Sequence, residues 1–361
     1  MTPDLASACR AATYKLAGHG DRNFGVLMEA FAKADAATPA DVYGVGEAIN
    51  GFEAEMAALL GKPAAVFFPS GVMAQQIGLR IWCDAAGCPT VAYHPTCHLE
   101  IHEEDGLRQL HHLRPVLVGA PDRLISLDDL AGLPDPVAAL LIELPQREIG
   151  GQLPSFDDLV RLVDAARARG MRVHLDGARL FETLPYYRVS AARICDLFDS
   201  VYVSFYKGFG SVAGAVLAGP VDFTAEAKVW KRRHGGDLIS LYPYVVAARH
   251  HMSARIDKMG AYWQHAQAVA ARFNLLPGVY TVPAVPVCNM FHVFFDVLPA
   301  VMEAVLEGVA KQLDVCVVAK ILPHGETGCK AELSFGDAYE EIPAGLLDEV
   351  FDQLASELAA L

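Results

Sequence analysis

The chain has 361 residues, 53% of them hydrophobic, and a formal net charge of −14 at pH 7. A chain of this length can bury a large core, as two or three domains or as one large and one small domain. The negative charge argues against nucleic acid or an anionic membrane as partner. The apolar runs are far shorter than the roughly 20 residues that span a bilayer, and residues 1–20 lack the apolar region of a secretory signal. We therefore expect a cytoplasmic protein.

The eight cysteines show no CxxC spacing, and most lie in apolar stretches. Without a secretory signal, a disulfide framework is not expected, and the sequence predicts buried, reduced thiols. The cysteines are Cys9, Cys83, Cys88, Cys97, Cys195, Cys288, Cys316 and Cys329.

The first two thirds of the chain alternate between helical and strand patterns. Apolar residues recur with helical spacing over residues 45–60, and Ser155 is a candidate N-cap of a helix that ends near Gly170. Strands that are apolar on both faces are typical of a sheet covered by helices on both sides. The alternation therefore predicts an α/β fold with a mainly parallel sheet. The predicted strands are 64–68, 90–93, 137–144, 172–175, 200–205 and 213–219.

After about residue 250 the pattern changes. One long helical stretch, 245–273, precedes strand patterns broken by prolines, and two further helices are predicted at 298–312 and about 344–360. This combination predicts a smaller α+β domain. The expected organisation is an N-terminal segment (1–30), a large ligand-binding domain (31–250) and a small C-terminal domain (251–361).

Chemically suggestive groups follow two of the predicted strands, where ligands of α/β sheets bind. Ser70 and Gly71 open a helix, whose free N–H groups and positive dipole end suit a phosphate, although an ordinary helix start looks the same. Asp176 can hold a heterocyclic nitrogen protonated, or cap the next helix. Arg179, three residues further, can bind a carboxylate or phosphate with two hydrogen bonds.

A lysine follows a third strand. Lys207 lies between Ser204 and two glycines, and a lysine that is poorly solvated becomes a nucleophile toward an aldehyde. Ser204 can add a phosphate contact. The chain thus carries a turn suited to phosphate, then an aspartate and then a lysine, the last two at the ends of successive strands. This is the order that pyridoxal phosphate (PLP) chemistry needs.

Six stretches resemble the threonine aldolase and β-eliminating lyase group of fold-type-I PLP enzymes. They follow the family's order over roughly residues 40–220, and the pair formed by HLDGAR and the later SxxKGxG is specific. The resemblance implies a seven-stranded, mainly parallel sheet flanked by helices, with a smaller C-terminal α+β domain. The stretches are DVYG at 41–44, FEAEMAALLGKPAAVFFPSG at 52–71, HLEIHE at 98–103, the spacing from Glu143 to the glycines at 150–151, VHLDGARLF at 173–181 and SFYKGFGSVAGAVLAG at 204–219.

The resemblance also implies roles for individual residues. Lys207 matches the lysine that forms the internal aldimine with PLP, and Asp176 matches the partner of the pyridine nitrogen. Arg179 matches an arginine that holds the substrate carboxylate or the cofactor, and His98 matches a histidine that stacks on the cofactor ring. Tyr43 lies in a segment that family members place near a neighbouring subunit's site, which implies a homodimer or homotetramer.

Other matched positions depart from the family. Ser70 and Gly71 match the phosphate-binding turn, but Val72 stands where the family has threonine. Gln146 replaces an active-site histidine and Ile239 replaces an arginine. The cofactor-binding set is kept while much of the substrate-contacting set differs. The resemblance therefore implies PLP but leaves the amino acid substrate open.

Three histidines form an H-x3-H-x3-H run: His94, His98 and His102. On one helical face they would resemble a metal site, and a metal hydrolase is the corresponding alternative function. Solvated or core histidines, and ring stacking by His98, are the other interpretations. No metal is expected.

The expected reaction is the cleavage of a β-hydroxy amino acid to glycine and an aldehyde, with His98, or a water held by Gln146 or Glu103, as base near the hydroxyl. β-Elimination and transamination are alternatives with the same cofactor. A relative that keeps the pocket without the chemistry is a further alternative.

Overall fold

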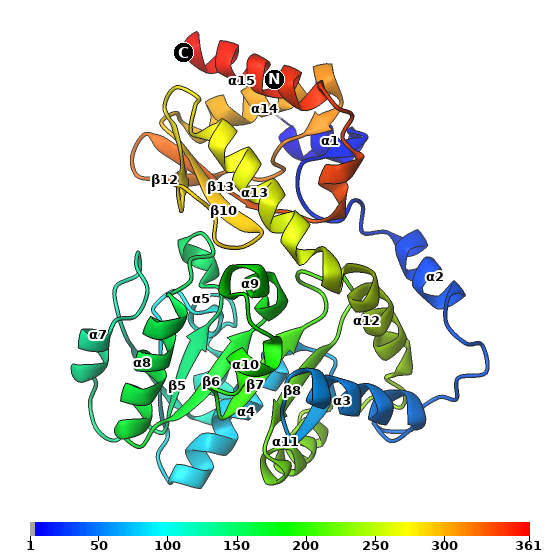
Figure 1. Cartoon of the computed structure of the whole chain (residues 1–361), viewed down its shortest axis with the longest axis vertical. Helices are drawn as coiled ribbons and strands as arrows, with labels where there is room; N and C mark the ends of the chain where they lie inside the picture. Colours follow the sequence, from blue (N-terminus) through cyan, green and yellow to red (C-terminus); the bar gives the residue numbers. More distant parts are fainter. Residues whose placement is uncertain (1–3) are drawn as a thin grey trace. The chain divides into compact units, whose positions relative to one another are not determined.

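The computed structural model describes residues 4–361 (Figure 1). The chain forms two compact units and passes between them more than once. The larger unit contains residues 23–148 and 153–257. The smaller unit contains the described residues up to 22, residues 149–152 and residues 258–361. The N-terminal residues thus pack with the C-terminal part of the chain.

The larger unit is built on a seven-stranded sheet with the strand order β2-β8-β7-β6-β5-β3-β4. Neighbouring strands are parallel except at β8, which runs antiparallel to both β2 and β7. The carboxyl ends of the other six strands therefore lie at one edge of the sheet. The strands are β2 (Ala64–Phe68), β3 (Thr90–Tyr93), β4 (Arg114–Leu117), β5 (Ala139–Glu143), β6 (Arg172–Gly177), β7 (Ser200–Ser204) and β8 (Ala215–Gly219).

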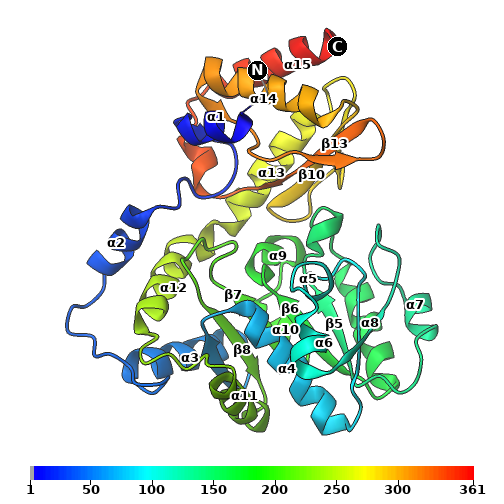
Figure 2. The same ribbon diagram turned by 180° about the vertical axis from the view of Figure 1, so that it is seen from behind.

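Helices cover both faces of this sheet, because its central strands are apolar on both sides. α4 (Gly71–Ala86) crosses one face beside α11 (Val221–Arg233), and α3 (Glu47–Leu59) and α8 (Phe156–Ala168) cover the other, as the opposite views of Figures 1 and 2 show. The remaining helices of the larger unit are α2 (Phe24–Ala32), α5 (His98–Ile101), α6 (Gly106–His111), α7 (Leu127–Ala131), α9 (Leu180–Tyr187), α10 (Ala191–Cys195) and α12 (Tyr242–Arg255).

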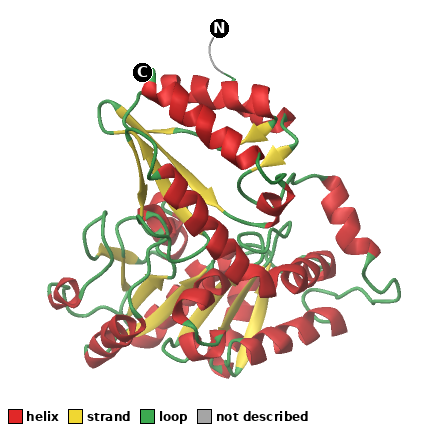
Figure 3. Cartoon of the chain, turned by 45° about the horizontal axis from the view of Figure 1, so that its top comes forward, coloured by secondary structure: helices red, strands yellow, loops and turns green. Residues whose placement is uncertain are grey.

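The smaller unit has a four-stranded antiparallel sheet with the order β12-β13-β10-β9. Its helices α13 and α14 pack against this sheet. A separate short parallel pair, β1 with β11, ties the N-terminal segment to the C-terminal part of the chain. Figure 3 colours the helices red and the strands yellow. The elements are α1 (Leu5–Ala11), β1 (Tyr14–Lys15), α13 (Met259–Phe273), β9 (Val279–Val282), β10 (Met290–Phe295), α14 (Pro299–Leu313), β11 (Val315–Cys316), β12 (Leu322–His324), β13 (Gly328–Ser334), η3 (Asp337–Glu341) and α15 (Leu346–Ala359).

The six predicted strands and the flanking helices are confirmed, and the fold class with them. The hydroxyl of Ser155 caps α8 by accepting from the Asp158 N–H, and Gly170 follows that helix in the left-handed region at φ 78°. The sequence missed β4, because this four-residue edge strand contains Pro115 and has no fully buried side chain. The helical stretch predicted over 245–273 is broken by a 3-10 turn, η2 (Ile256–Lys258), between α12 and α13.

Two cysteines do not follow the expectation of reduced thiols. Cys9 and Cys316 form a disulfide with their Cα atoms 4.7 Å apart. They are 307 residues apart in sequence, and the packing of α1 against β11 brings them together. The other six cysteines are free and buried, as predicted. Within the described residues, no helix is long and apolar enough to cross a bilayer.

Candidate active site

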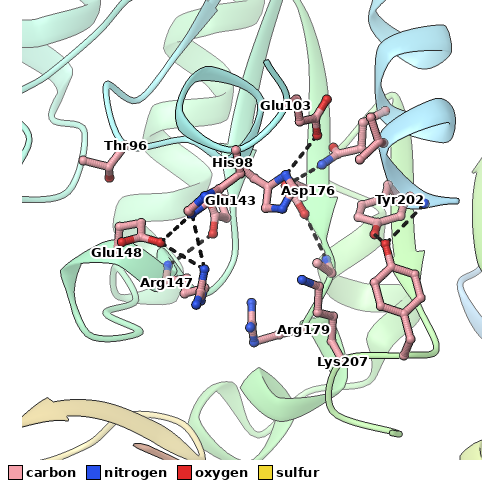
Figure 4. Close-up of a pocket in the computed structure, with 16 residues that line it drawn as sticks. Thr96, His98, Glu103, Glu143, Arg147, Glu148, Asp176, Arg179, Tyr202 and Lys207 are labelled. Carbon is pink, nitrogen blue, oxygen red and sulfur yellow. Dashed lines mark hydrogen bonds and ion pairs between the residues drawn. The ribbon is translucent and has the colours of Figure 1, made fainter. Parts of the chain in front are cut away.

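A pocket of the larger unit lies at the edge of the sheet where the parallel strands end (Figure 4). Its walls come from the segments that follow β2, β3, β5, β6 and β7. The residues singled out from the sequence that line it are Gly71, Val72, His98, His102, Glu103, Asp176, Arg179 and Lys207.

Asp176 lies at the end of β6 and is 2% exposed. Its Oδ2 accepts a hydrogen bond from Gln75 Nε2 at 2.6 Å, and its Oδ1 accepts from the Ala178 N–H at 3.0 Å. Burial raises the pKa of Asp176, and these two hydrogen bonds oppose the rise. The carboxylate faces the pocket, and it does not cap the next helix, because α9 begins after Arg179.

Lys207 follows β7 and is partly buried, with its Nζ 5.5 Å from the centre of the Tyr206 ring. The next residue, Gly208, packs closely against Glu182. A Cβ on Gly208 would lie 1.9 Å from Glu182 Oε1. Glu182 is 3% exposed, and burial raises its pKa to about 7. A buried carboxyl thus packs against the turn from which Lys207 reaches the pocket.

The turn between β2 and α4 forms a cradle at the N-terminus of a 16-residue helix. Ser70 is the N-cap, and its side chain makes no capping hydrogen bond within the described residues. A Cβ on Gly71 would lie 1.9 Å from Tyr202 Oη and 2.6 Å from Tyr206 Oη, so only glycine fits there. The Gly71 N–H donates to Tyr206 Oη at 3.3 Å. The N–H groups at the start of a helix, beside two tyrosine hydroxyls, suit a phosphate.

Ser204 ends β7 on the same face of the strand as Tyr202. Its hydroxyl is buried and, among the described residues, has no well-aligned hydrogen-bond partner. A buried hydroxyl without a partner is costly and fits a ligand that supplies one. Ser204 and Ser70 are not among the residues that line the pocket itself.

His98 opens α5 after β3, and its ring is held by a buried carboxylate. Nδ1 of His98 lies 2.9 Å from Glu103 Oε1, and Gln76 Nε2 donates to Glu103 Oε2 at 2.8 Å. The Glu103 side chain is 1% exposed. His98 also lies close enough to Asp176 to oppose the rise in its pKa. The ring is thus fixed beside the carboxylate expected to bind the pyridine nitrogen.

Gln146 does not reach the pocket. It is buried and donates to Glu143 Oε2 at 3.1 Å and to Thr96 Oγ1 at 3.4 Å. Glu143 is the register neighbour of Asp176 on β5, and burial together with Asp176 raises the pKa of Glu143. The amide at the position of the family's histidine therefore contacts Glu143 and Thr96, both of which line the pocket.

The sequence missed several lining residues, notably Arg147 and Glu148 in η1 (Arg147–Ile149). Arg147 Nη1 donates to Glu148 Oε1 at 3.0 Å, and His102 Nε2 lies 3.0 Å from the same oxygen. One feature of the sequence could have pointed to these two residues. Gln146 stands where the family has a histidine, and Arg147 and Glu148 follow it directly.

The histidine run does not occupy one helical face. α5 is a single turn, and His94 lies before it, with Nε2 2.9 Å and 2.8 Å from the carbonyls of Ala120 and Arg123. Within residues 4–361, no group of three histidine, cysteine or acidic side chains is placed to hold a metal.

Tyr43 lies outside this pocket. Its side chain is 47% exposed, its φ is 48°, and the Arg232 guanidinium lies 5.1 Å from the centre of its ring.

The sheet order, with a lysine, an aspartate and a helix N-terminus at the ends of parallel strands, defines a fold-type-I PLP enzyme. The beta-eliminating lyase family model matches residues 25–296, and the chain belongs to this family. The family, fold and cofactor implied by the resemblance are confirmed, and the chain is a PLP-dependent lyase.

Two solved structures are similar over nearly the whole chain. One, from Listeria monocytogenes EGD-E and provisionally assigned as an L-allo-threonine aldolase, is 50% identical, with 98% of each chain covered and a TM-score of 0.96. The other, from Exiguobacterium sp. 255-15 and provisionally assigned as an aromatic amino acid beta-eliminating lyase/threonine aldolase, is 51% identical, with 98% of this chain and 99% of that chain covered and a TM-score of 0.96. Low-specificity L-threonine aldolase 1 of Arabidopsis thaliana is 27% identical over 71% of this chain and 74% of its own.

Proposed function

We propose that this enzyme is an aldolase that cleaves a β-hydroxy amino acid between Cα and Cβ, releasing glycine and an aldehyde. The observation that carries the proposal is the arrangement of Lys207, Asp176 and the Gly71 cradle around one pocket. Relatives named threonine aldolases, one 50% identical over 98% of the chain, support retro-aldol cleavage as the reaction.

The residues present fit PLP. Lys207 would bind its aldehyde carbon covalently and Asp176 its pyridine nitrogen, while His98 would stack on the ring. Ser70, Gly71 and Val72 at the N-terminus of α4, and the buried Ser204 hydroxyl, would hold the phosphate. When bound, the cofactor supplies an electron sink for the charge that develops at Cα.

The chain's own side chains orient the substrate. Arg179 is partly buried in the pocket and offers two parallel N–H donors to the α-carboxylate. Because the bond that breaks must lie perpendicular to the cofactor ring, a clamp on the carboxylate selects which Cα bond is presented. The family resemblance also implies substrate contacts for Tyr43 and Gln146. Gln146 would influence the substrate indirectly, through its hydrogen bonds to Glu143 and Thr96. Tyr43 would contact the substrate in the site of a neighbouring subunit.

A substrate panel tests this function. Threonine, phenylserine and 3-hydroxyaspartate would each be assayed for aldehyde and glycine at one pH. We expect retro-aldol products from at least one of them, with threonine not the best, because Gln146 cannot exchange a proton near neutral pH. Ammonia and a keto acid in place of glycine would instead establish β-elimination. A tenfold preference for threonine would correspond to about 1.4 kcal/mol and would contradict the expected substrate preference.

We also propose that the protein is a cytoplasmic homodimer or homotetramer. Three large apolar side chains of α2 are exposed, Phe24 at 73%, Met28 at 50% and Phe31 at 36%. The 42–45 turn, which hydrogen-bonds to the Ile239 carbonyl through the Tyr43 N–H, is exposed and apolar as well. Such a surface is typical of an interface between subunits. Light scattering of the wild type and of Met28→Asp tests this, and an active wild-type monomer would contradict it.

A further inference from the structure

A histidine at the pocket wall has an acidic partner but no role in holding the cofactor. His102 follows α5, lines the pocket and leaves 40% of its side chain exposed. Its ring centroid lies 5.1 Å from that of His98. The side chain therefore combines access to a bound substrate with a fixed position next to the ring expected to stack on the cofactor.

The other proton-exchanging groups of the pocket are already engaged. His98 is bound by the buried Glu103, Asp176 by Gln75 and Ala178, and Lys207 is the covalent attachment point of the proposed function. Gln146, which stands where a histidine was expected from the family, is buried and bonded to Glu143 and Thr96. His102 is thus a second imidazole that lines the pocket, and it is more exposed than His98.

Glu148 holds the ring of His102 in place. His102 Nε2 lies 3.0 Å from Glu148 Oε1, and Arg147 Nη1 holds the same oxygen at 3.0 Å. Arg147 Nη1 also lies 3.4 Å from His102 Nε2. If Nε2–H donates to the carboxylate, Nδ1 is the nitrogen that can accept a proton. A carboxylate that orients an imidazole in this way is the arrangement general bases use.

We propose that His102, oriented by Glu148, is the general base that removes the proton of the substrate's β-hydroxyl. The O–H electron pair becomes the second bond of the aldehyde carbonyl, the Cα–Cβ bond breaks, and its electron pair remains on Cα. Cα then takes up a proton from water, which gives glycine, and His102 returns its proton to the hydroxide that results. This inference rests on the proposed retro-aldol function.

The test compares His102→Gln and Glu148→Gln with the wild-type holoenzyme. His112→Asn serves as the matched control, because His112 is exposed, lies outside the pocket and has a φ of 55° that asparagine tolerates. Aldehyde release from phenylserine reports the proposed step. Exchange of the glycine α-hydrogen in D2O involves no β-hydroxyl. The absorbance near ~420 nm and its change on titration with glycine report cofactor attachment and ligand binding without turnover.

We expect His102→Gln to lower kcat for aldehyde release about 100-fold, on the scale of general-base catalysis. Glu148→Gln should lower it about tenfold, and His112→Asn should leave it unchanged. Glycine affinity, glycine exchange and the ~420 nm absorbance should stay within twofold of the wild type in all three variants.

Two results would overturn the role of His102 alone. One is His102→Gln with kcat within threefold of the wild type. The other is a variant that loses glycine exchange and the ~420 nm absorbance to the same degree as aldehyde release, because that pattern indicates a structural role. A wild type that exchanges the glycine α-hydrogen but releases no aldehyde from any β-hydroxy amino acid would overturn the proposed function and this inference together.

Discussion

Gln75 Nε2 donates a 2.6 Å hydrogen bond to Asp176 Oδ2, and this bond ends a buried chain of donors. Trp82 Nε1 donates to Ser200 Oγ at 2.7 Å, and Ser200 Oγ lies 2.7 Å from His174 Nδ1. His174 Nε2 lies 3.3 Å from Gln75 Oε1. Because Gln75 Oε1 can only accept, His174 Nε2 carries the proton and His174 Nδ1 accepts from the Ser200 hydroxyl, so each group donates in turn toward Asp176. Burial lowers the pKa of His174 to about 3, so its ring stays neutral in this chain.

This relay predicts that Gln75 positions Asp176. Asp176→Ala should lower turnover about 100-fold or more, because the charge opposite the pyridine nitrogen is lost in a water-excluded site. Gln75→Leu should cost about tenfold, since Asp176 keeps its charge and the Ala178 bond but loses one donor. Steady-state kinetics on an identified substrate measures both effects. Near wild-type turnover in Asp176→Ala would show that Asp176 does not have this role.

Lys207→Ala is expected to abolish the covalent attachment of the cofactor. Among the pocket-lining residues Lys207 is the primary amine, and it lies three residues after the end of β7. The absorbance near ~420 nm should disappear. Peptide mapping of the wild type after borohydride reduction should find the pyridoxyl group on Lys207. Labelling of Lys320 or Lys330 instead would contradict the assignment.

Gly71→Ala should weaken cofactor binding strongly. The added Cβ would lie 1.9 Å from Tyr202 Oη, so the start of α4 or the tyrosine must move. We expect at least a tenfold weaker dissociation constant for PLP, measured by titration of the cofactor-free protein. Gly308→Ala is the matched control, since no atom lies within 4 Å of a Cβ at that helical glycine and the variant should bind PLP normally. Equal affinity for PLP in the two variants would show that the turn at Gly71 does not hold the cofactor's phosphate.

Glu182→Gln should change how stability depends on pH. Burial raises the pKa of Glu182 from 4.5 to about 7. Below pH 4.5 the carboxyl is protonated in both states. As the pH rises from 4.5 through 7, the unfolded chain ionises while the native state retains the proton, and the wild type loses about 3 kcal/mol of unfolding free energy. Glutamine has no such titration.

Urea denaturation of the cofactor-free proteins at pH 5 and pH 8 checks this expectation. The unfolding free energy of Glu182→Gln, relative to the wild type, should rise between these two pH values. The contributions of the other titrating groups cancel in the comparison. A difference that stays constant with pH would mean that Glu182 is ionised in the native state.

The sequence by itself determined the sheet and the order of its chemical groups. Strands such as β6 and β7 are short and apolar on both faces, so burial alone identifies them, and a parallel sheet places Asp176 and the residues after β7 at the same edge. Lys207 and Gly71 could be singled out from the sequence because the pattern that marks each of them is local. In both cases a glycine stands beside a charged or hydroxyl side chain shortly after a strand.

The tertiary structure decided which side chains meet across separate elements. The contact of His102 with Glu148 spans 46 residues, and the Cys9–Cys316 disulfide spans 307. Gln146 and Arg147 are adjacent in sequence, yet one is buried and the other lines the pocket. Local patterns report how a residue's own segment is buried. Contacts between distant segments depend on how the helices and turns pack on the sheet, which is set by the combined burial of many side chains.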